Sequence, residues 1–224
     1  MLEIIYKLFI KGDVLIPGGT AITAFSFYVF PKLDKAERWV PLILLTYILT
    51  EIAASYFALH GWHNLWIYNV MLIPESALLA IVFSGKLNTG KQRYLLLFLV
   101  CALLLIHSSN MLFYQGWNEF NNYTYIPIIV LQAVFSFLYL RSTMMDLNTK
   151  PFDHLVSWLA IATLIDAAGS IPILTTLAWH DFLNSGYSDL LSELVMYLFY
   201  GWFLIIGAGI LWTKTSLRSR FSSR

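Results

Sequence analysis

The chain has 224 residues, of which 58% are hydrophobic and only 12% are charged, and its formal net charge is +1. Soluble domains carry about 25% charged residues, so this composition excludes a water-soluble globular domain of this size. The low net charge also argues against a nucleic-acid partner, because such a partner requires a clustered basic surface.

Seven apolar stretches have the length and composition of membrane-spanning helices. A spanning helix needs about 20 mostly apolar residues, with a range of about 17–25. The sequence predicts helices at Val14–Phe30, Trp39–Leu59, Leu65–Gly85, Tyr94–His107, Tyr125–Leu140, His154–Leu177 and Asp189–Thr213. The connections between them are too short to hold a second domain. We therefore expect an all-α polytopic membrane protein that forms a single domain over residues 1–224.

The basic residues indicate how this protein is oriented in the membrane. Of the 14 Lys and Arg residues, 12 lie in alternate connections and at the C-terminus, and the loops at 60–64, 108–124 and 178–188 contain none. Cytoplasmic loops carry the excess of Lys and Arg in membrane proteins. The distribution predicts an N-terminus outside, a C-terminus in the cytoplasm and a basic cytoplasmic tail at residues 214–224.

The first eleven residues form a separate pattern. Glu3, Lys7 and Lys11 recur every four residues and would share one helical face, opposite apolar residues that include Leu2 and Phe9. This pattern favours an amphipathic helix that lies on the outer membrane surface. A plain extension of the first span is the alternative.

The second and third predicted helices resemble the sixth and seventh in sequence. Residues 51–55 (EIAAS) resemble residues 166–170 (DAAGS), and residues 61–64 (GWHN) resemble residues 178–181 (AWHD). Both pairs would run in the same direction through the membrane. The pattern predicts two parallel repeats of three helices, joined by the fourth helix.

Four acidic residues lie inside the predicted spans, namely Glu51, Glu75, Asp166 and Glu193. A charged side chain at the bilayer centre costs about 2.5–3.5 kcal/mol on insertion scales, so such residues usually face the bundle interior and serve function. No Lys or Arg lies within the spans to neutralise these acids. They must therefore be protonated, hydrogen-bonded to polar neighbours or paired with a bound cation.

Other polar groups lie at similar depths and extend this candidate site. Asn69, His107 and Gln132 could contribute to binding a ligand or a proton. Pro74 and Pro172 lie on helices that carry acids, and each proline frees a backbone carbonyl that could bind an ion. The alternative is that these groups hydrogen-bond between helices and fix the packing.

Histidines gather at the outer side, where His63 and His180 are candidate metal ligands. Histidine beside acidic residues suits either a pH-responsive site or a metal site. No His-x-x-x-His spacing is present, so the ligands would have to come from separate loops. Ordinary interfacial histidine is the alternative.

No cofactor is predicted. A retinal protein needs a lysine within its last helix for the Schiff base, and Leu190–Leu211 contains none. The sequence Ile73-Pro74-Glu75-Ser76 resembles the proline-acid motif of heterodimer-type lycopene cyclases, over two helices, and this likeness implies a buried acid that acts on an isoprenoid. Residues 50–75 resemble uncharacterised small polytopic proteins of bacteria, which implies a bacterial inner membrane and supplies no function.

Three classes of function agree with these patterns. The first is an acid-lined cavity, open to the outer side, that binds protons, a cation or a cationic ligand in a transporter or a sensor. A sensor would need a separate signalling partner. The second is a membrane enzyme that uses Glu75 or Asp166 as a general acid on a lipid or isoprenoid. The third is a scaffold with structural acids. The expected partners are the lipid bilayer and a small ligand or cation, and the oligomeric state, including a homo-oligomer, is left open.

Overall fold

The computed structural model of this chain describes residues 15–87, 90–117, 119, 121–146, 150–178 and 185–222. In the described part of the chain all regular structure is helical. The long helices are α2 (Leu15–Val29), α3 (Val40–Leu59), α4 (Leu65–Ser84), α5 (Gly90–Phe113), α6 (Asn122–Met145), α7 (Leu155–Ala178) and α8 (Ser185–Ser222). Short 3-10 helices stand in the connections, namely η2 (Phe30–Lys32), η3 (Glu37–Trp39) and η4 (Pro151–Asp153). The predicted all-α class is confirmed.

Six helices of the described part are long and apolar enough to cross a membrane. These segments are Glu37–Leu59, Leu65–Ser84, Gly90–Phe113, Tyr123–Met145, Leu155–Thr176 and Leu194–Thr213. They make the chain a multi-pass membrane protein. Helix α2 has 15 described residues, so the structure leaves the seventh span and the 3+1+3 repeat as predictions.

Three helices are longer than the sequence predicts. Helix α5 begins at Gly90 and not at Tyr94, and α6 extends to Met145. Helix α8 runs over 38 residues to Ser222, through most of the predicted basic tail. Apolar composition marks only the part of a helix that lies in the hydrocarbon, whereas Lys, Arg and Gln at the ends also have good helix propensity. The helices therefore extend past their apolar segments.

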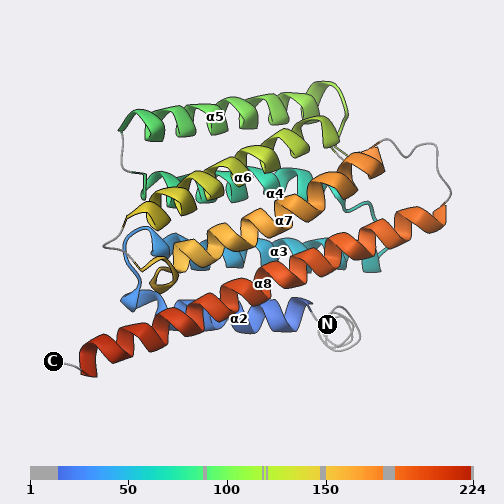
Figure 1. The fold of residues 1–224 in the computed structure, drawn as a ribbon. Coiled ribbons are helices and arrows are strands. Elements are labelled where there is room, and N and C mark those ends of the chain that lie inside the picture. Colours follow the sequence, from blue (N-terminus) through green and yellow to red (C-terminus); the bar gives the residue numbers. More distant parts are fainter. Residues whose placement is uncertain are drawn as a thin grey trace.

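The helices form one bundle in which neighbours in sequence are neighbours in space (Figure 1). Helix α2 packs against α3 and also against α8, which closes the circuit of helices. Helix α5 lies at the edge of the bundle and contacts α4 and α6. Because α4 and α6 also contact each other, α5 stays outside the interior that α3, α4, α6, α7 and α8 share.

The bundle has two chemically different halves. At one end, which we call the basic end, α2, α4, α6 and α8 finish and α3, α5 and α7 begin. The connections that carry most of the Lys and Arg residues lie at this end. The main apolar core occupies the adjoining half of the bundle and includes Ile43, Leu44, Phe83, Leu159 and Ile206, each at most 1% exposed. The acids of α3, α4 and α7 lie farther from the basic end than this core.

Candidate functional site

The carboxyl group of Glu75, on α4, is contacted by side chains of α3 and α6. Glu75 lies in the middle of α4 and is 8% exposed. The Tyr47 hydroxyl of α3 donates a hydrogen bond to Glu75 Oε1. From α6, Gln132 Nε2 donates to Ser76 Oγ at 3.0 Å and lies 3.4 Å from Glu75 Oε1. Both groups are donors, as a carboxylate requires.

The Tyr47 ring is fixed by aromatic packing against α8. Its centroid lies 4.9 Å from that of Phe199, 4.6 Å from that of Trp202 and 6.3 Å from that of Phe203. Aromatic pairs at these separations stabilise by about 0.5–1.5 kcal/mol beyond their buried area. Helix α8 therefore holds the hydroxyl that binds Glu75, although α8 contributes no described acid to the site.

Helix α7 adds the second acid, Asp166. Its carboxyl group is half-buried and accepts a hydrogen bond from Ser170 Oγ at 3.2 Å, one turn along the same helix. Asp166 and Glu75 are close enough to interact electrostatically. The two carboxyl groups therefore repel each other whenever both are ionised.

Tyr125, near the start of α6, lies within electrostatic range of these two acids and of Glu51. The Tyr125 phenol interacts electrostatically with Glu51, Glu75 and Asp166, and also with Tyr68. The Tyr68 hydroxyl in turn lies 3.4 Å from Glu51 Oε2. The structure thus gathers three of the four predicted acids, with Gln132, around tyrosine hydroxyls on α3, α4 and α6. We call this group the acid cluster.

The acid cluster has no basic neighbour on the helices that form it. Helices α3, α4 and α7 contain no Lys or Arg, and α6 has only Arg141, at the basic end. Burial and mutual repulsion both favour the protonated form of a carboxylic acid, and a nearby cation favours the charged form. A shared proton or a bound small cation is therefore the chemistry that this arrangement suits.

Asn69 and His107 belong to a second polar group, at the end of the bundle opposite the basic end. His107 is fully buried on α5, with Nε2 2.9 Å from the Asn69 carbonyl oxygen and Nδ1 2.7 Å from Thr124 Oγ1. The Asn69 side chain donates to the Glu119 carbonyl at 2.7 Å and accepts from the Asn121 backbone N–H at 3.2 Å. These bonds join the α5–α6 connection to α4.

The remaining predicted site residues are placed as follows. His63 is exposed in the connection between α3 and α4. His180 and the side chain of Glu193 lie outside the described residues, as does the amphipathic segment at 1–11. The metal site at His63 and His180 therefore stays a prediction.

A hollow of about 450 Å³ lies away from the acid cluster, between α5 and α6. Leu105 and Ile106 form part of its apolar wall, and Asn110 and Thr124 contribute polar groups. Glu75 is packed against polar side chains of the neighbouring helices. The acid-lined cavity open to the outer side therefore stays a prediction.

The sequence interpretation missed two components of the site, Tyr125 and the pairing of Tyr47 with Glu75. Tyr47 lies four residues before Glu51, on the same helical face, and that spacing gives no information on the neighbouring helix. No protein-family model, no curated protein and no solved structure matches this chain.

Proposed function

We propose that this protein is a transporter of the bacterial inner membrane, which binds protons or a small cation at the acid cluster. The observation that carries the proposal is the electrostatic pairing of buried Glu75 with half-buried Asp166, for which the described residues supply no Lys or Arg on the helices of the acid cluster beside the two acids. Such a pair loses its first proton more readily than its second, and a bound cation favours the second ionisation. The protein then exchanges its bound proton or cation as its acids change charge.

The proposal includes seven spans, with the N-terminus outside and the C-terminus in the cytoplasm. Helix α2 is the seventh span, since it is apolar and packs against both α3 and α8. An odd number of spans puts the termini on opposite sides. The basic end is cytoplasmic by the charge rule. The acid cluster then communicates with the outer side, because the apolar core fills the inner half of the bundle.

Transport agrees with the surroundings of the acids better than acid catalysis on an isoprenoid does. A general acid that protonates an alkene needs apolar walls for its substrate. The neighbours of Glu75 are instead a tyrosine hydroxyl, the Gln132 amide and Ser76. The oxygen atoms of these groups can coordinate a partly dehydrated cation or hydrogen-bond to the water that it carries.

The first test is the melting temperature of the purified protein from about pH 4 to pH 9, which brackets carboxyl titration. Burial disfavours the ionised acids, so the melting temperature should fall as pH rises, and added Na⁺, K⁺ or Ca²⁺ that fits the site should restore it. Glu75→Gln keeps the side-chain shape and the acceptor for Tyr47, and should flatten this response. Glu119→Gln, which changes an exposed acid, is the matched control and should behave as wild type.

A response that survives in Glu75→Gln would contradict the proposal. Flat curves for the wild-type protein, with and without cations, would also contradict it and would favour structural acids or an enzyme.

A further inference from the structure

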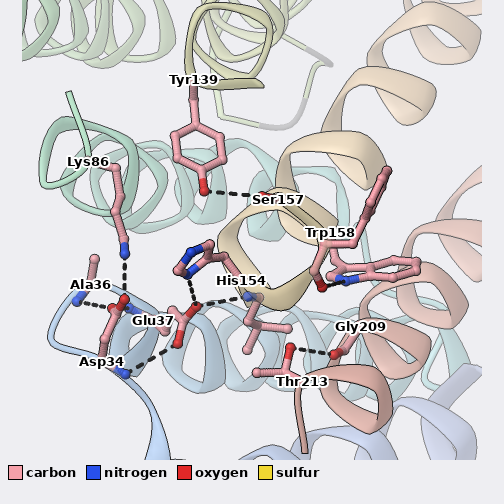
Figure 2. A network of polar contacts seen from close by, with 12 residues as sticks. Asp34, Ala36, Glu37, Lys86, Tyr139, His154, Ser157, Trp158, Gly209 and Thr213 are labelled. Carbon is pink, nitrogen blue, oxygen red and sulfur yellow. Dashed lines mark hydrogen bonds and ion pairs between the residues drawn. The ribbon is translucent and has the colours of Figure 1, made fainter. Parts of the chain in front are cut away.

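The connection between α2 and α3 crosses the basic end of the bundle and binds two other helices (Figure 2). Residues 30–39 carry two acids, Asp34 and Glu37. Asp34 forms an ion pair with Lys86, just after the end of α4. Glu37 contacts the first residue of α7. We call this arrangement the inner clamp.

Glu37 is the central residue of the inner clamp. The residue is 5% exposed, which is rare for a carboxylate. Its Oε1 accepts the backbone N–H of Leu155 at 2.8 Å and lies 3.8 Å from His154 Nδ1. The first N–H groups of a helix lack partners within the helix, and the helix dipole favours negative charge there. Glu37 therefore caps α7 from a position 118 residues earlier in the chain.

Asp34 holds Glu37 in this position through a reciprocal capping box. Asp34 Oδ1 accepts the backbone N–H of Glu37 at 2.9 Å, and Glu37 Oε2 accepts the backbone N–H of Asp34 at 3.2 Å. This is the pattern in which two residues, three positions apart, satisfy each other's free donors. The other Asp34 oxygen, Oδ2, binds Lys86. One connection therefore binds both the residue after the end of α4 and the first residue of α7.

The inner clamp does not have the features of a metal site. One ligand atom each from Asp34, Glu37 and His154 lies within 4.8 Å of the others. However, Lys86 already neutralises Asp34, and both oxygens of Glu37 accept backbone N–H groups. A divalent cation would have to displace these contacts.

The inner clamp joins the helices that carry the acid cluster. Lys86 follows α4, which carries Glu75, and Leu155 begins α7, which carries Asp166. The connection itself leads into α3, which carries Tyr47. Between the clamp and the acids lies the apolar core, and Ser157 and Tyr139 bond to each other there at 3.2 Å.

We propose that the inner clamp is the gate that closes the cytoplasmic end of the bundle. It must release α4 or α7 before the acid cluster can communicate with the cytoplasm. The transport role of this opening and the assignment of the basic end to the cytoplasm rest on the proposed function, whereas the closure of the basic end does not.

The test measures how fast a thiol behind the clamp reacts. Ser157 is fully buried, and Ser157→Cys in a Cys101→Ser background places a single thiol in the first turn of α7. A membrane-impermeant maleimide is added to inside-out vesicles and, separately, to intact cells, so that the basic end is reached in either orientation. Glu37→Gln should increase the labelling rate at least about tenfold, which corresponds to ~1.4 kcal/mol in the opening equilibrium. Lys35→Gln, which changes an exposed charge in the same connection, should leave the rate unchanged.

Lys86→Met removes the ion pair of Lys86 with Asp34 and keeps the test decisive if Glu37→Gln does not fold. Faster labelling in a folded clamp variant, with Lys35→Gln unchanged, supports the gate. Equal rates in Lys86→Met, Lys35→Gln and the parent would overturn it. The thermal titration of Glu75→Gln does not depend on the labelling result. Faster labelling of the clamp variants without a Glu75-dependent thermal response would refute the proposed function alone. A Glu75-dependent thermal response with equal labelling rates would refute the gate alone.

Discussion

Asp34 lies outside the membrane-spanning segments, and its neighbours favour the ionised form of its carboxyl group. Partial burial by itself raises the pKa of Asp34, but the hydrogen bond from Lys86 and those from the Glu37 and Ala36 backbone N–H groups favour the ionised form. The net effect lowers the pKa below its ordinary value of 3.8. The ion pair therefore stabilises the folded protein above that ordinary pKa and is lost as pH falls through the lowered one.

The first prediction follows from this sign. Asp34→Asn should lower the melting temperature near neutral pH, because it removes the charge that binds Lys86. It should also weaken the loss of stability on acidification below about pH 4, where an ordinary aspartate becomes protonated. A series of melting temperatures from neutral pH to about pH 3 checks this, with exposed Glu119→Gln as control. Equal acid sensitivity of Asp34→Asn and wild type would contradict the assignment.

At the scale of helices, α8 approaches α7 closely at Gly209. A Cβ atom added there would lie 2.4 Å from Trp158 Cγ and 2.5 Å from Trp158 Cβ. These atoms are close to the backbone and cannot move far. The Trp158 indole N–H also donates to the Phe152 carbonyl at 2.9 Å, which fixes the ring (Figure 2). Gly209 is therefore required for the α7–α8 contact.

The second prediction compares two glycines of α8. Gly209→Ala should destabilise the protein by ~1–3 kcal/mol, as overpacking does in close-packed interiors. A Cβ at Gly201 meets nothing within 4 Å, so Gly201→Ala should be neutral or stabilise by up to ~1 kcal/mol. Melting temperatures of both variants decide the matter. A loss in Gly201→Ala as large as that in Gly209→Ala would show that α8 and α7 do not meet in this way.

The helices could be predicted from the sequence because a run of about 20 apolar residues has few other structures in a membrane. Their ends could not, since α5 and α8 continue into polar segments where composition no longer distinguishes helix from loop. The Asp34-x-x-Glu37 pattern is a readable capping-box signal that the sequence interpretation did not use.

Contacts between helices were the harder part to predict. Glu51, Glu75 and Asp166 could be identified because charge inside an apolar span is rare. The rotation of each helix about its axis decides which tyrosine meets which acid, and sequence spacing does not give that rotation. The contact of Glu37 with Leu155 is likewise a tertiary contact, between residues 118 positions apart. His107 was grouped with the acids by depth alone, and the structure shows bonds to Asn69 and Thr124.

At the scale of the whole molecule, the bundle collects the basic connections at one end (Figure 1). The third prediction is that this end faces the cytoplasm. In a Cys101→Ser background, His63→Cys should react with an impermeant maleimide added outside intact cells. Lys150→Cys should react only in inside-out vesicles. Both positions are exposed, so accessibility reports the side of the membrane. The opposite pattern would reverse the proposed orientation.

The measurement that tests the central claim most directly is proton movement in vesicles reconstituted with purified protein and loaded with a pH-sensitive dye. An imposed pH gradient, with candidate cations inside or outside, should drive flux through wild type and Glu119→Gln and not through Glu75→Gln. Because Glu75→Gln retains the acceptor for Tyr47, loss of flux with a normal fold would assign the effect to the titrating carboxyl. Equal flux in Glu75→Gln and wild type, or no flux above empty vesicles under any gradient, would contradict a proton- or cation-binding transporter.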